Sequence, residues 1–325
     1  MAIRRRHTIP ATFLLLSVLL LLTFIHPTLA ACECGYLATI RPDLSDPSTH
    51  TTALFTDILE TDFSRLLPPA NQDGDPSSSI VGTDLAKYTP DWAPQAFNLT
   101  AKRARGEYGE MFDVGNVRVV DPAAQGRGMA GDGRTLELVV RKGLVDGMVP
   151  VAEVDTRRLD VGYGTFRAVM KVPGVKGTCA AFFWYHNDTQ EIDIEFLSKD
   201  FSPSRSHFPV NLVLQSRRSA EAGHDASGTE NFVQTTLPFD PTADFHEYRI
   251  DYLPGMVVFY ADGAPLATMT SASGVPTTAG HLILSHWSNG NPLWSGGPPR
   301  EDAVLKVRSV KAYFNSSDPG CDAGE

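Results

Sequence analysis

Three acidic residues alternate with apolar ones in one short segment, and this pattern is the clearest sign of chemistry in the chain. Residues 190–196 read QEIDIEF. Alternate side chains of a β-strand point to the same side, so Glu191, Asp193 and Glu195 share one face. Neighbouring carboxylates repel one another, and no Lys or Arg lies between residues 177 and 198 to neutralise them. The row therefore indicates a functional cluster rather than a solvated acidic face.

The spacing of these carboxylates suits the cleavage of a glycosidic bond. On a strand, the Cα atoms of Glu191 and Glu195 lie roughly 13 Å apart. Two glutamates that lean together can reach the carboxyl separation of about 5–5.5 Å that retaining glycosidases use. Asp193 between them raises the pKa of at least one member by like-charge repulsion, as an acid catalyst requires. Binding of Ca²⁺ is the competing interpretation, but a flat strand presents its carboxylates badly for it.

The elements around this row are predicted to be short strands. Gly, Pro, Asn and Asp turns separate segments of alternating or continuous apolar residues, which are typical of strands. No amphipathic helix of 12 residues follows residue 30, whereas 51–67 suits a strand or a helix. The sequence thus predicts an all-β, antiparallel sandwich. The predicted strands are 135–142, 165–172, 179–185, 245–253, 256–261, 281–287 and 304–314.

The first thirty residues resemble a secretory signal peptide. Three arginines at 4–6 precede an apolar run at 11–25, and small residues surround Ala30. A membrane anchor is the alternative, but the run is shorter than the roughly 20 apolar residues of a span. We therefore expect a signal peptide at 1–30 and a single domain at 31–325, free of the membrane after cleavage. With 28 basic and 38 acidic residues and a net charge of −10, the chain is not expected to bind nucleic acid.

Two further features agree with an extracellular, disulfide-bonded glycoprotein. Glycosylation sequons begin at Asn98, Asn187 and Asn315. Four cysteines suit an oxidising compartment and allow three pairings. We expect Cys32 and Cys34 each to bridge to one of the other two, with the partner of each left open. The cysteines are Cys32, Cys34, Cys179 and Cys321.

A series of motifs resembles glycoside hydrolase family 16, and 191–200 looks closest to its lichenase-like branch. The resemblance covers about residues 51–317. It also fits the fungal cell-wall glucanases and transglycosylases of that family. The motifs are, in chain order, 162–171 (GYGTFRAVMK), 181–185 (AFFWY), 191–200 (EIDIEFLSKD), 245–255 (FHEYRIDYLPG), 258–263 (VFYADG) and 284–290 (LSHWSNG).

This resemblance implies a two-sheet jelly-roll sandwich of the concanavalin A-like kind, with a cleft across its concave sheet. It makes Glu191 the nucleophile, Glu195 the general acid and base, and Asp193 an assisting group. The motif lacks the extra residue of the laminarinase-like branch, which lowers the case for a strictly β-1,3 substrate. No cofactor is expected for catalysis. Family members often carry a structural Ca²⁺, whose ligands the sequence does not identify.

Aromatic residues are the next candidates, because sugar rings stack on Trp and Tyr. We predict substrate binding by Trp287, Trp184 and Trp294, with core packing as the alternative for each. Asn289 is a fourth candidate, although an Asn-Gly pair at 289–290 also suits a turn.

The sequence therefore predicts a secreted, monomeric, retaining endo-β-glucanase that acts on β-1,3/1,4-type glucans. A wall association outside the cell is consistent with this substrate. A transglycosylase of cell-wall polysaccharide is the first alternative. A non-catalytic, lectin-like glucan-binding sandwich is the second, and the three carboxylates argue against it.

Overall fold

The structure is a computed structural model that describes residues 35–46, 48–66, 79–121 and 133–316. All of these belong to one compact unit, Gly35–Glu325. The predicted signal peptide, Cys32, Cys34 and Cys321 lie outside the described residues. Among the described residues, no helix is long and apolar enough to cross a membrane.

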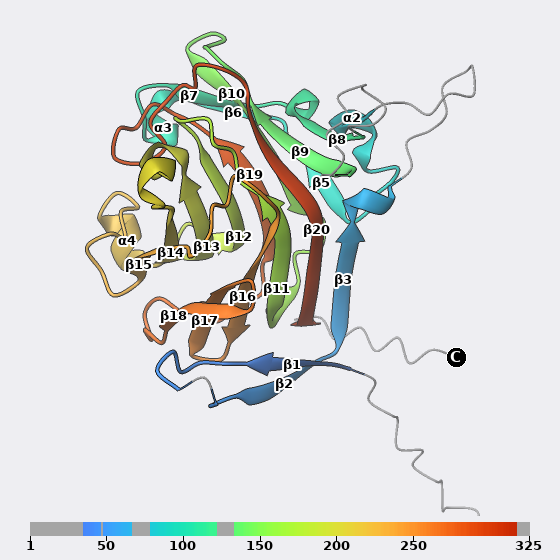
Figure 1. Ribbon diagram of the computed structural model, residues 1–325, viewed down its shortest axis with the longest axis vertical. Helices are drawn as coiled ribbons and strands as arrows, with labels where there is room; N and C mark the ends of the chain where they lie inside the picture. The colour runs from blue at the N-terminus through green and yellow to red at the C-terminus, as the bar shows by residue number, and fades with distance from the viewer. Residues whose placement is uncertain (1–34, 47, 67–78, 122–132, 317–325) are drawn as a thin grey trace, which may run out of the picture. The chain divides into compact units, whose positions relative to one another are not determined.

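The acidic segment lies inside a nine-stranded sheet, here called the first sheet (Figure 1). Neighbouring strands pair antiparallel, except that β10 and β7 pair parallel. The strands are, in spatial order, β15 (Phe232–Thr236), β14 (Pro209–Gln215), β13 (Gln190–Leu197), β12 (Cys179–Asn187), β19 (His281–Trp287), β10 (Met148–Thr156), β7 (Gly109–Phe112) and β6 (Phe97–Leu99), with β5 (Trp92–Pro94) paired to β10.

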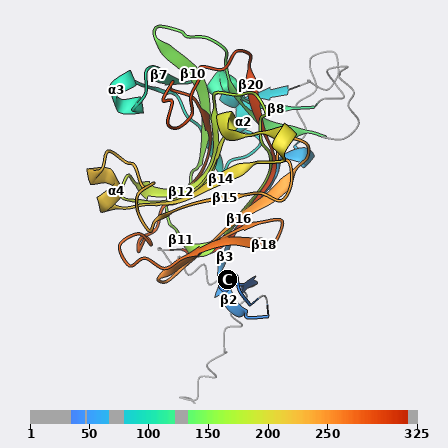
Figure 2. The same cartoon turned by 60° about the vertical axis from the view of Figure 1, so that its left-hand side comes forward.

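A second nine-stranded sheet packs against the first and completes the sandwich (Figure 2). Its strands are β18 (Ala264–Met269), β17 (Met256–Ala261), β16 (His246–Leu253), β11 (Val161–Lys171), β20 (Ala303–Ser316), β9 (Thr135–Val140), β8 (Val117–Val120) and β4 (Ser79–Val81), with β3 (Asp57–Asp62) paired to β20. The jelly-roll sandwich predicted from the sequence is therefore confirmed, as are the predicted strands to within a few residues.

One face of each sheet supplies the core between them. Ile192, Ile194 and Phe196 of β13 are fully buried there. Phe166 and Met170 of β11 meet them from the second sheet. Because side chains alternate along a strand, burying these residues turns the acidic ones of β13 to the opposite, outer face of the first sheet.

The segment 51–67, left open between strand and helix, forms strands β2 (Thr51–Phe55) and β3 and the 3₁₀ turn η2 (Phe63–Arg65). Strand β2 pairs with β1 (Tyr36–Ile40) as a hairpin. The hairpin buries Ile40 and Phe55 against Val258 and Tyr260 of β17, on the outer face of the second sheet.

Helical elements are short within the described residues, as the sequence indicated. The α-helices are α2 (Gly82–Leu85), α3 (Ala101–Ala104) and α4 (Arg217–Glu221), and the remaining 3₁₀ turns are η3 (Val114–Asn116), η4 (Ser198–Asp200) and η5 (Pro203–Arg205).

Candidate active site

Strand β13 is an interior strand, and its outer face carries the three carboxyls. It pairs with β12 on one side and β14 on the other. Glu195 lies opposite Ala181 and Asn211, Asp193 opposite Phe183 and Val213, and Glu191 opposite Tyr185 and Gln215. Aromatic and amide side chains therefore flank the acidic row, and no basic residue stands on either neighbouring strand position.

Two donors hold one oxygen of Glu195. The indole Nε1 of Trp294 donates to its Oε1 at 3.1 Å. The thiol of Cys179, at the start of β12, lies 3.6 Å from the same atom. Neither contact involves Oε2 of Glu195, so Oε2 is the oxygen that can exchange a proton with a substrate.

Asp193 supports Glu191 from the middle of the row. Its side chain is 4% exposed, and it is hydrogen-bonded to Glu191. Burial, followed by repulsion from Glu191 and Glu195, raises the pKa of Asp193 well above its usual range. The same hydrogen bond lowers the pKa of Glu191. These directions favour a protonated Asp193 that donates to a Glu191 carboxylate.

Burial sets the protonation of the two glutamates. It raises the pKa of Glu191 to about 7, helped by repulsion from Glu195. It also raises the pKa of Glu195 to about 7, against the donors Trp294 and Cys179. The guanidinium of Arg105, just after α3, lowers the pKa of all three β13 carboxyls. Near neutral pH one carboxyl can be ionised while the other stays protonated, which is the pairing that acid and nucleophile require.

A second group of acids lies on the first sheet and was missed by the sequence reasoning. Glu153 and Asp155 of β10 lie opposite Ser285 and Ile283 of β19. Burial, then repulsion from Asp155, raises the pKa of Glu153 well above its usual range. Burial likewise raises the pKa of Asp155 to about 7 and that of Glu110 on β7 to about 8. The sequence does indicate this group through the acid–apolar–acid pattern at 153–155, which repeats the alternation of β13.

Comparison with known proteins agrees with this geometry. The sequence model described as "Glycosyl hydrolases family 16" matches residues 124–304, more than half of the chain. The chain belongs to glycosyl hydrolase family 16.

Curated relatives of similar sequence include β-glucanases. One from Paenibacillus polymyxa is 31% identical over 141 residues, which are 42% of this chain and 52% of the relative. One from Acetivibrio thermocellus is 30% identical over 161 residues, 47% of this chain and 43% of the relative. The chain thus spans about half the length of the curated relatives it matches.

Solved structures share the fold at lower identity. A β-1,3-1,4-glucanase (lichenase) from a mouse hindgut metagenome has a TM-score of 0.53 at 19% identity, covering 79% of this chain and 98% of that one. An endo-1,3-β-glucanase (laminarinase) domain from Thermotoga petrophila RKU-1 has a TM-score of 0.55 at 17% identity, covering 78% and 96%. These likenesses establish the fold of this family 16 chain.

The candidate substrate-binding residues divide between the outer face and the interior. Trp294 is half-buried and contacts Glu195. Trp287, at the end of β19, is half-buried and pairs with Cys179. Trp184 is fully buried, donates to the carbonyl of Val161 at 2.8 Å and packs against Tyr252 of the second sheet. The prediction that Trp184 binds substrate is therefore wrong, because its strand position faces the core.

Asn289 also proves to be structural. It is 3% exposed, its Nδ2 donates to the carbonyl of Ala104 at 2.6 Å, and its Oδ1 accepts from Ser295 and from the backbone of Asn291. With these partners it fastens the 288–296 loop to α3, and so positions Trp294 and Arg105. The prediction that it binds a sugar hydroxyl is corrected to a positioning role.

Cys179 is a free, buried thiol. Burial, then the charge of Glu195, raises its pKa well above the usual range. The expectation that Cys179 joins a disulfide is wrong, because its side chain is enclosed beside Glu195.

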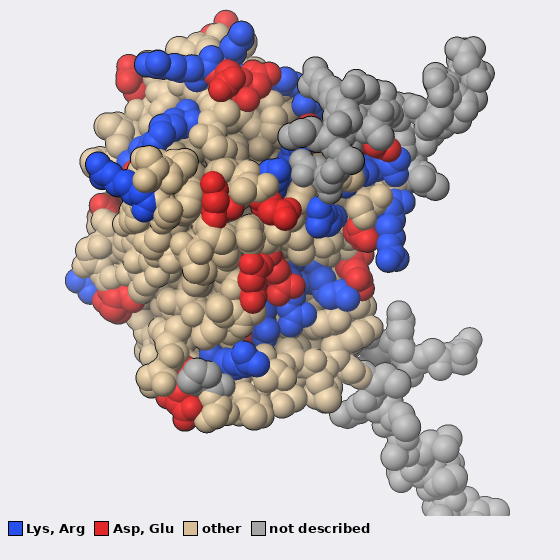
Figure 3. All heavy atoms as spheres, viewed as in Figure 1, with Lys and Arg blue, Asp and Glu red and all other residues tan. Residues whose placement is uncertain are grey.

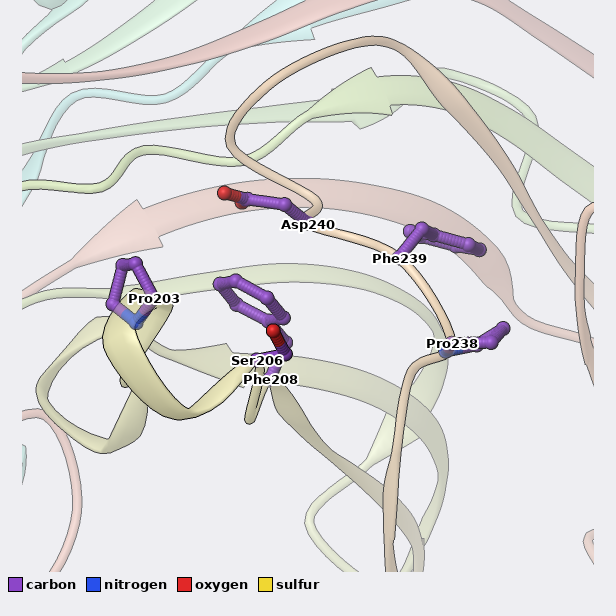
Figure 4. A pocket seen from close by; sticks show the side chains of 6 residues that line it. All are labelled: Pro203, Ser206, Phe208, Pro238, Phe239 and Asp240. Carbon is purple, nitrogen blue, oxygen red and sulfur yellow. The ribbon is translucent and has the colours of Figure 1, made fainter.

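The described residues hold no group of three or more His, Cys, Asp or Glu side chains that could bind a metal. The structural Ca²⁺ that the family resemblance implied stays a prediction, because Ca²⁺ also binds backbone and amide oxygens, and no step below involves one. Charges of both signs are interspersed over the surface in Figure 3. A pocket of about 210 Å³ is lined by six residues, none of them on β13 (Figure 4): Pro203, Ser206, Phe208, Pro238, Phe239 and Asp240.

Proposed function

We propose that the protein is a retaining endo-β-glucanase that cleaves β-1,3/1,4-type glucans through a glycosyl-enzyme on Glu191. The observation that carries the proposal is the division of labour on β13. Asp193 donates to Glu191, whereas Trp294 and Cys179 hold Glu195. The β-glucanase names of the relatives and the lichenase fold neighbour support the substrate class.

The first half of the reaction needs an ionised Glu191 and a protonated Glu195. The Glu191 carboxylate attacks the anomeric carbon, while Glu195 gives its proton to the departing sugar oxygen. The hydrogen bond from Asp193 weakens as Glu191 loses its negative charge in the attack. Asp193 therefore adjusts the reactivity of Glu191 as the charge of Glu191 changes. In the second half, the Glu195 carboxylate takes a proton from water, which then releases the sugar with its configuration retained.

The groups on the outer face are suited to hold sugar hydroxyls. Gln215, opposite Glu191, has a buried Oε1 without a hydrogen-bond partner. Asp155 likewise has an unpartnered Oδ1. Buried acceptors of this kind gain a partner when a hydroxyl arrives, which favours a polyhydroxylated substrate over an apolar one.

A glucan digest tests the proposal. Mixed-linkage glucan, β-1,3-glucan, xyloglucan, galactan and chitin oligosaccharides are incubated with the protein, and products are identified by mass and by the anomer first released. We expect cleavage of β-glucans with the β-anomer first, and none by Glu191→Gln. The matched control Glu247→Gln, on β16 of the second sheet, retains activity.

Two results would change the assignment. Release of the α-anomer first contradicts the retaining mechanism. Binding of glucans without new reducing ends supports the lectin-like alternative instead.

We also propose that the protein is secreted as a monomer after cleavage near Ala31. Amino-terminal sequencing of protein from the culture medium tests this. A start at Met1 in a membrane fraction would support the anchor alternative.

A further inference from the structure

Two loops that are tied together bring charged and polar groups to the catalytic row. The first, residues 105–108, connects α3 to β7 and carries Arg105. The second, residues 288–296, follows β19 and carries Trp294, whose indole donates to Glu195. The two loops together are here called the clamp. A cation and a hydrogen-bond donor thus belong to one connected unit.

Hydrogen bonds in both directions hold the clamp together. Nδ2 of Asn289 donates to the carbonyl of Ala104, the last residue of α3, at 2.6 Å. Nδ2 of Asn291 donates to the carbonyl of Arg105 at 3.2 Å. In return, the backbone N–H of Tyr108 donates to the carbonyl of Asn289 at 2.8 Å. The backbone on both sides of Arg105 is therefore fixed.

The backbone of Arg105 is strained as well as fixed. It adopts the left-handed conformation, with φ of 59° and ψ of 32°, which is unfavourable for a residue with a side chain. Such strain persists where surrounding contacts impose it, and it is concentrated at functional sites. A Cβ on the next residue, Gly106, would lie 2.2 Å from the carbonyl oxygen of Asn289. The clamp therefore leaves this turn no room to relax.

The clamp contacts carboxyls on two strands of the first sheet. Asn289 is hydrogen-bonded to Glu110 of β7, which is 6% exposed. Trp294, on the same loop, donates to Glu195 of β13. Arg105 is exposed, so its guanidinium stays in solvent while its charge lowers the pKa of both acids.

The catalytic row benefits from a cation, because burial favours its neutral form. Burial raises the pKa of Glu191, whereas attack on the anomeric carbon requires its carboxylate. Asp193 opposes this rise by its hydrogen bond, and Arg105 opposes it by its charge. The same charge also acts on Glu195. Arg105 therefore shifts the ionisation of Glu191 and Glu195 together.

We propose that Arg105 is a positioning residue for the reaction, held by the clamp so that its positive charge keeps Glu191 in the carboxylate form that attacks the sugar. The proposal rests on the proposed function and deepens it. Arg105 touches no reacting atom in this role and acts through the carboxyls. Asn289 and Asn291 act one step further away, because they fix the backbone from which the guanidinium extends.

The pH profile of kcat/KM tests the proposal. Its acidic limb reports the ionisation of Glu191, and its alkaline limb that of Glu195. In Arg105→Met both carboxyls lose the same cation, so we expect both limbs to move upward by about half a unit to one unit. Arg105→Lys keeps the charge and should restore both limbs. The control Arg103→Met removes an exposed cation of α3 and should keep the wild-type profile.

Ionic strength provides an independent measurement on the same proteins. Because Arg105 is exposed, added salt screens its charge. We expect salt to move both limbs of the wild-type profile upward, toward those of Arg105→Met. The limbs of Arg105→Met itself should move much less.

Several results overturn the proposal. One is an Arg105→Met profile that falls in height without moving, which indicates a merely structural role. Another is a profile that Arg103→Met moves equally. A third is a shifted Arg105→Met profile that Arg105→Lys does not restore.

A wild-type protein that cleaves no glucan instead refutes the proposed function. Titration of the carboxyls then decides the role of Arg105 separately, by NMR of protein with carbon-13-labelled glutamate side chains. Glu191→Gln and Glu195→Gln assign the two signals. Unchanged titrations in Arg105→Met refute the role of the cation, and titrations moved to higher pH support it.

Discussion

Two strands of the molecule carry almost the same short pattern on their outer faces and use it differently. In β13 of the first sheet it is Glu191-Ile-Asp193, and in β16 of the second sheet it is Arg249-Ile-Asp251. Both isoleucines are buried in the core. The two patterns differ in their first residue. In β13 it is Glu191, which places an acid beside Asp193, and in β16 it is Arg249, which places a base beside Asp251.

The pair in β16 is a structural ion pair. Arg249 binds Asp251 through two hydrogen bonds of 2.7 and 2.6 Å, and the side chain of Asp251 is fully buried. Arg249 also donates to the carbonyl of Thr39 in hairpin β1–β2. Burial raises the pKa of Asp251, and the charge of Arg249 opposes that rise. The hairpin covers this pair, so its charges hold the fold together and meet no substrate.

Within the described part of the chain, the acids of β13 form no ion pair of this kind, although the charge of Arg105 lowers the pKa of each. Their pKa values are raised mainly by burial. Repulsion from Glu195 adds to the rise for Glu191, and repulsion from Glu191 and Glu195 adds to it for Asp193. An arrangement like this is unfavourable for folding, and it is found where proton transfer is needed. The comparison teaches that the charge of the neighbouring residue, rather than burial alone, distinguishes the structural acid of β16 from the acids of β13 that are proposed to react.

The largest expected effect is on β13. Glu191→Gln removes the proposed nucleophile, and we expect glucan hydrolysis to fall at least about 10³-fold. The free energy of unfolding should stay equal or rise, because a neutral amide removes the repulsion with Glu195. Activity assays and urea unfolding of the same preparation measure both. A Glu191→Gln variant that loses stability along with activity would contradict the expectation that Glu191, unlike the ion pair of β16, does not stabilise the fold.

On β16 the effect falls on stability. Arg249→Met leaves Asp251 buried without its cation, and we expect the free energy of unfolding to fall by about 3–5 kcal/mol. Activity per folded molecule should not change. The control Lys87→Met removes an exposed ion pair with Asp84 and should cost less than about 1 kcal/mol. Wild-type stability of Arg249→Met would show that this pair is dispensable.

The pH dependence of stability sharpens the same contrast. Folding raises the pKa of Glu191 and Glu195 from 4.5 to about 7. The folded state then binds more protons than the unfolded state between these values, so stability falls as pH rises through this window. We expect each carboxyl to contribute a loss of roughly 1–3 kcal/mol between pH 5 and 8. The double variant Glu191→Gln, Glu195→Gln should make the profile in urea titrations less steep, with the remaining slope left to Glu110, Glu153 and Asp155. A profile as steep as wild type would show that Glu191 and Glu195 do not take up protons on folding.

The smallest effect concerns the donor to Glu195. The indole of Trp294 lowers the pKa of Glu195 by its hydrogen bond. Because Glu195 must be protonated to act as an acid, Trp294→Phe should move the alkaline limb of the kcat/KM profile upward by about half a unit to one unit. Trp184→Phe, in the core, is the matched control and should lower Tm without moving that limb. A downward shift in Trp294→Phe would contradict the assigned hydrogen bond.

The sequence by itself determined the strand pattern and the acidic row. Alternation is a local property of the chain, so the buried isoleucines alone placed Glu191, Asp193 and Glu195 on one face. The same reasoning located β12, β19 and β20 to within a few residues. The motif series also indicated the family, because its segments keep their order along the chain.

Only the tertiary structure decided what surrounds that row. Trp184 and Trp294 were equal candidates for substrate binding in the sequence, yet Trp184 faces the core and Trp294 contacts Glu195. Phe232 and Glu153 reach the same outer face through the pairing of β15 with β14 and of β10 with β19. The physical reason is that pairing between distant strands depends on register and on which face is buried, and neither is a local property of the residues.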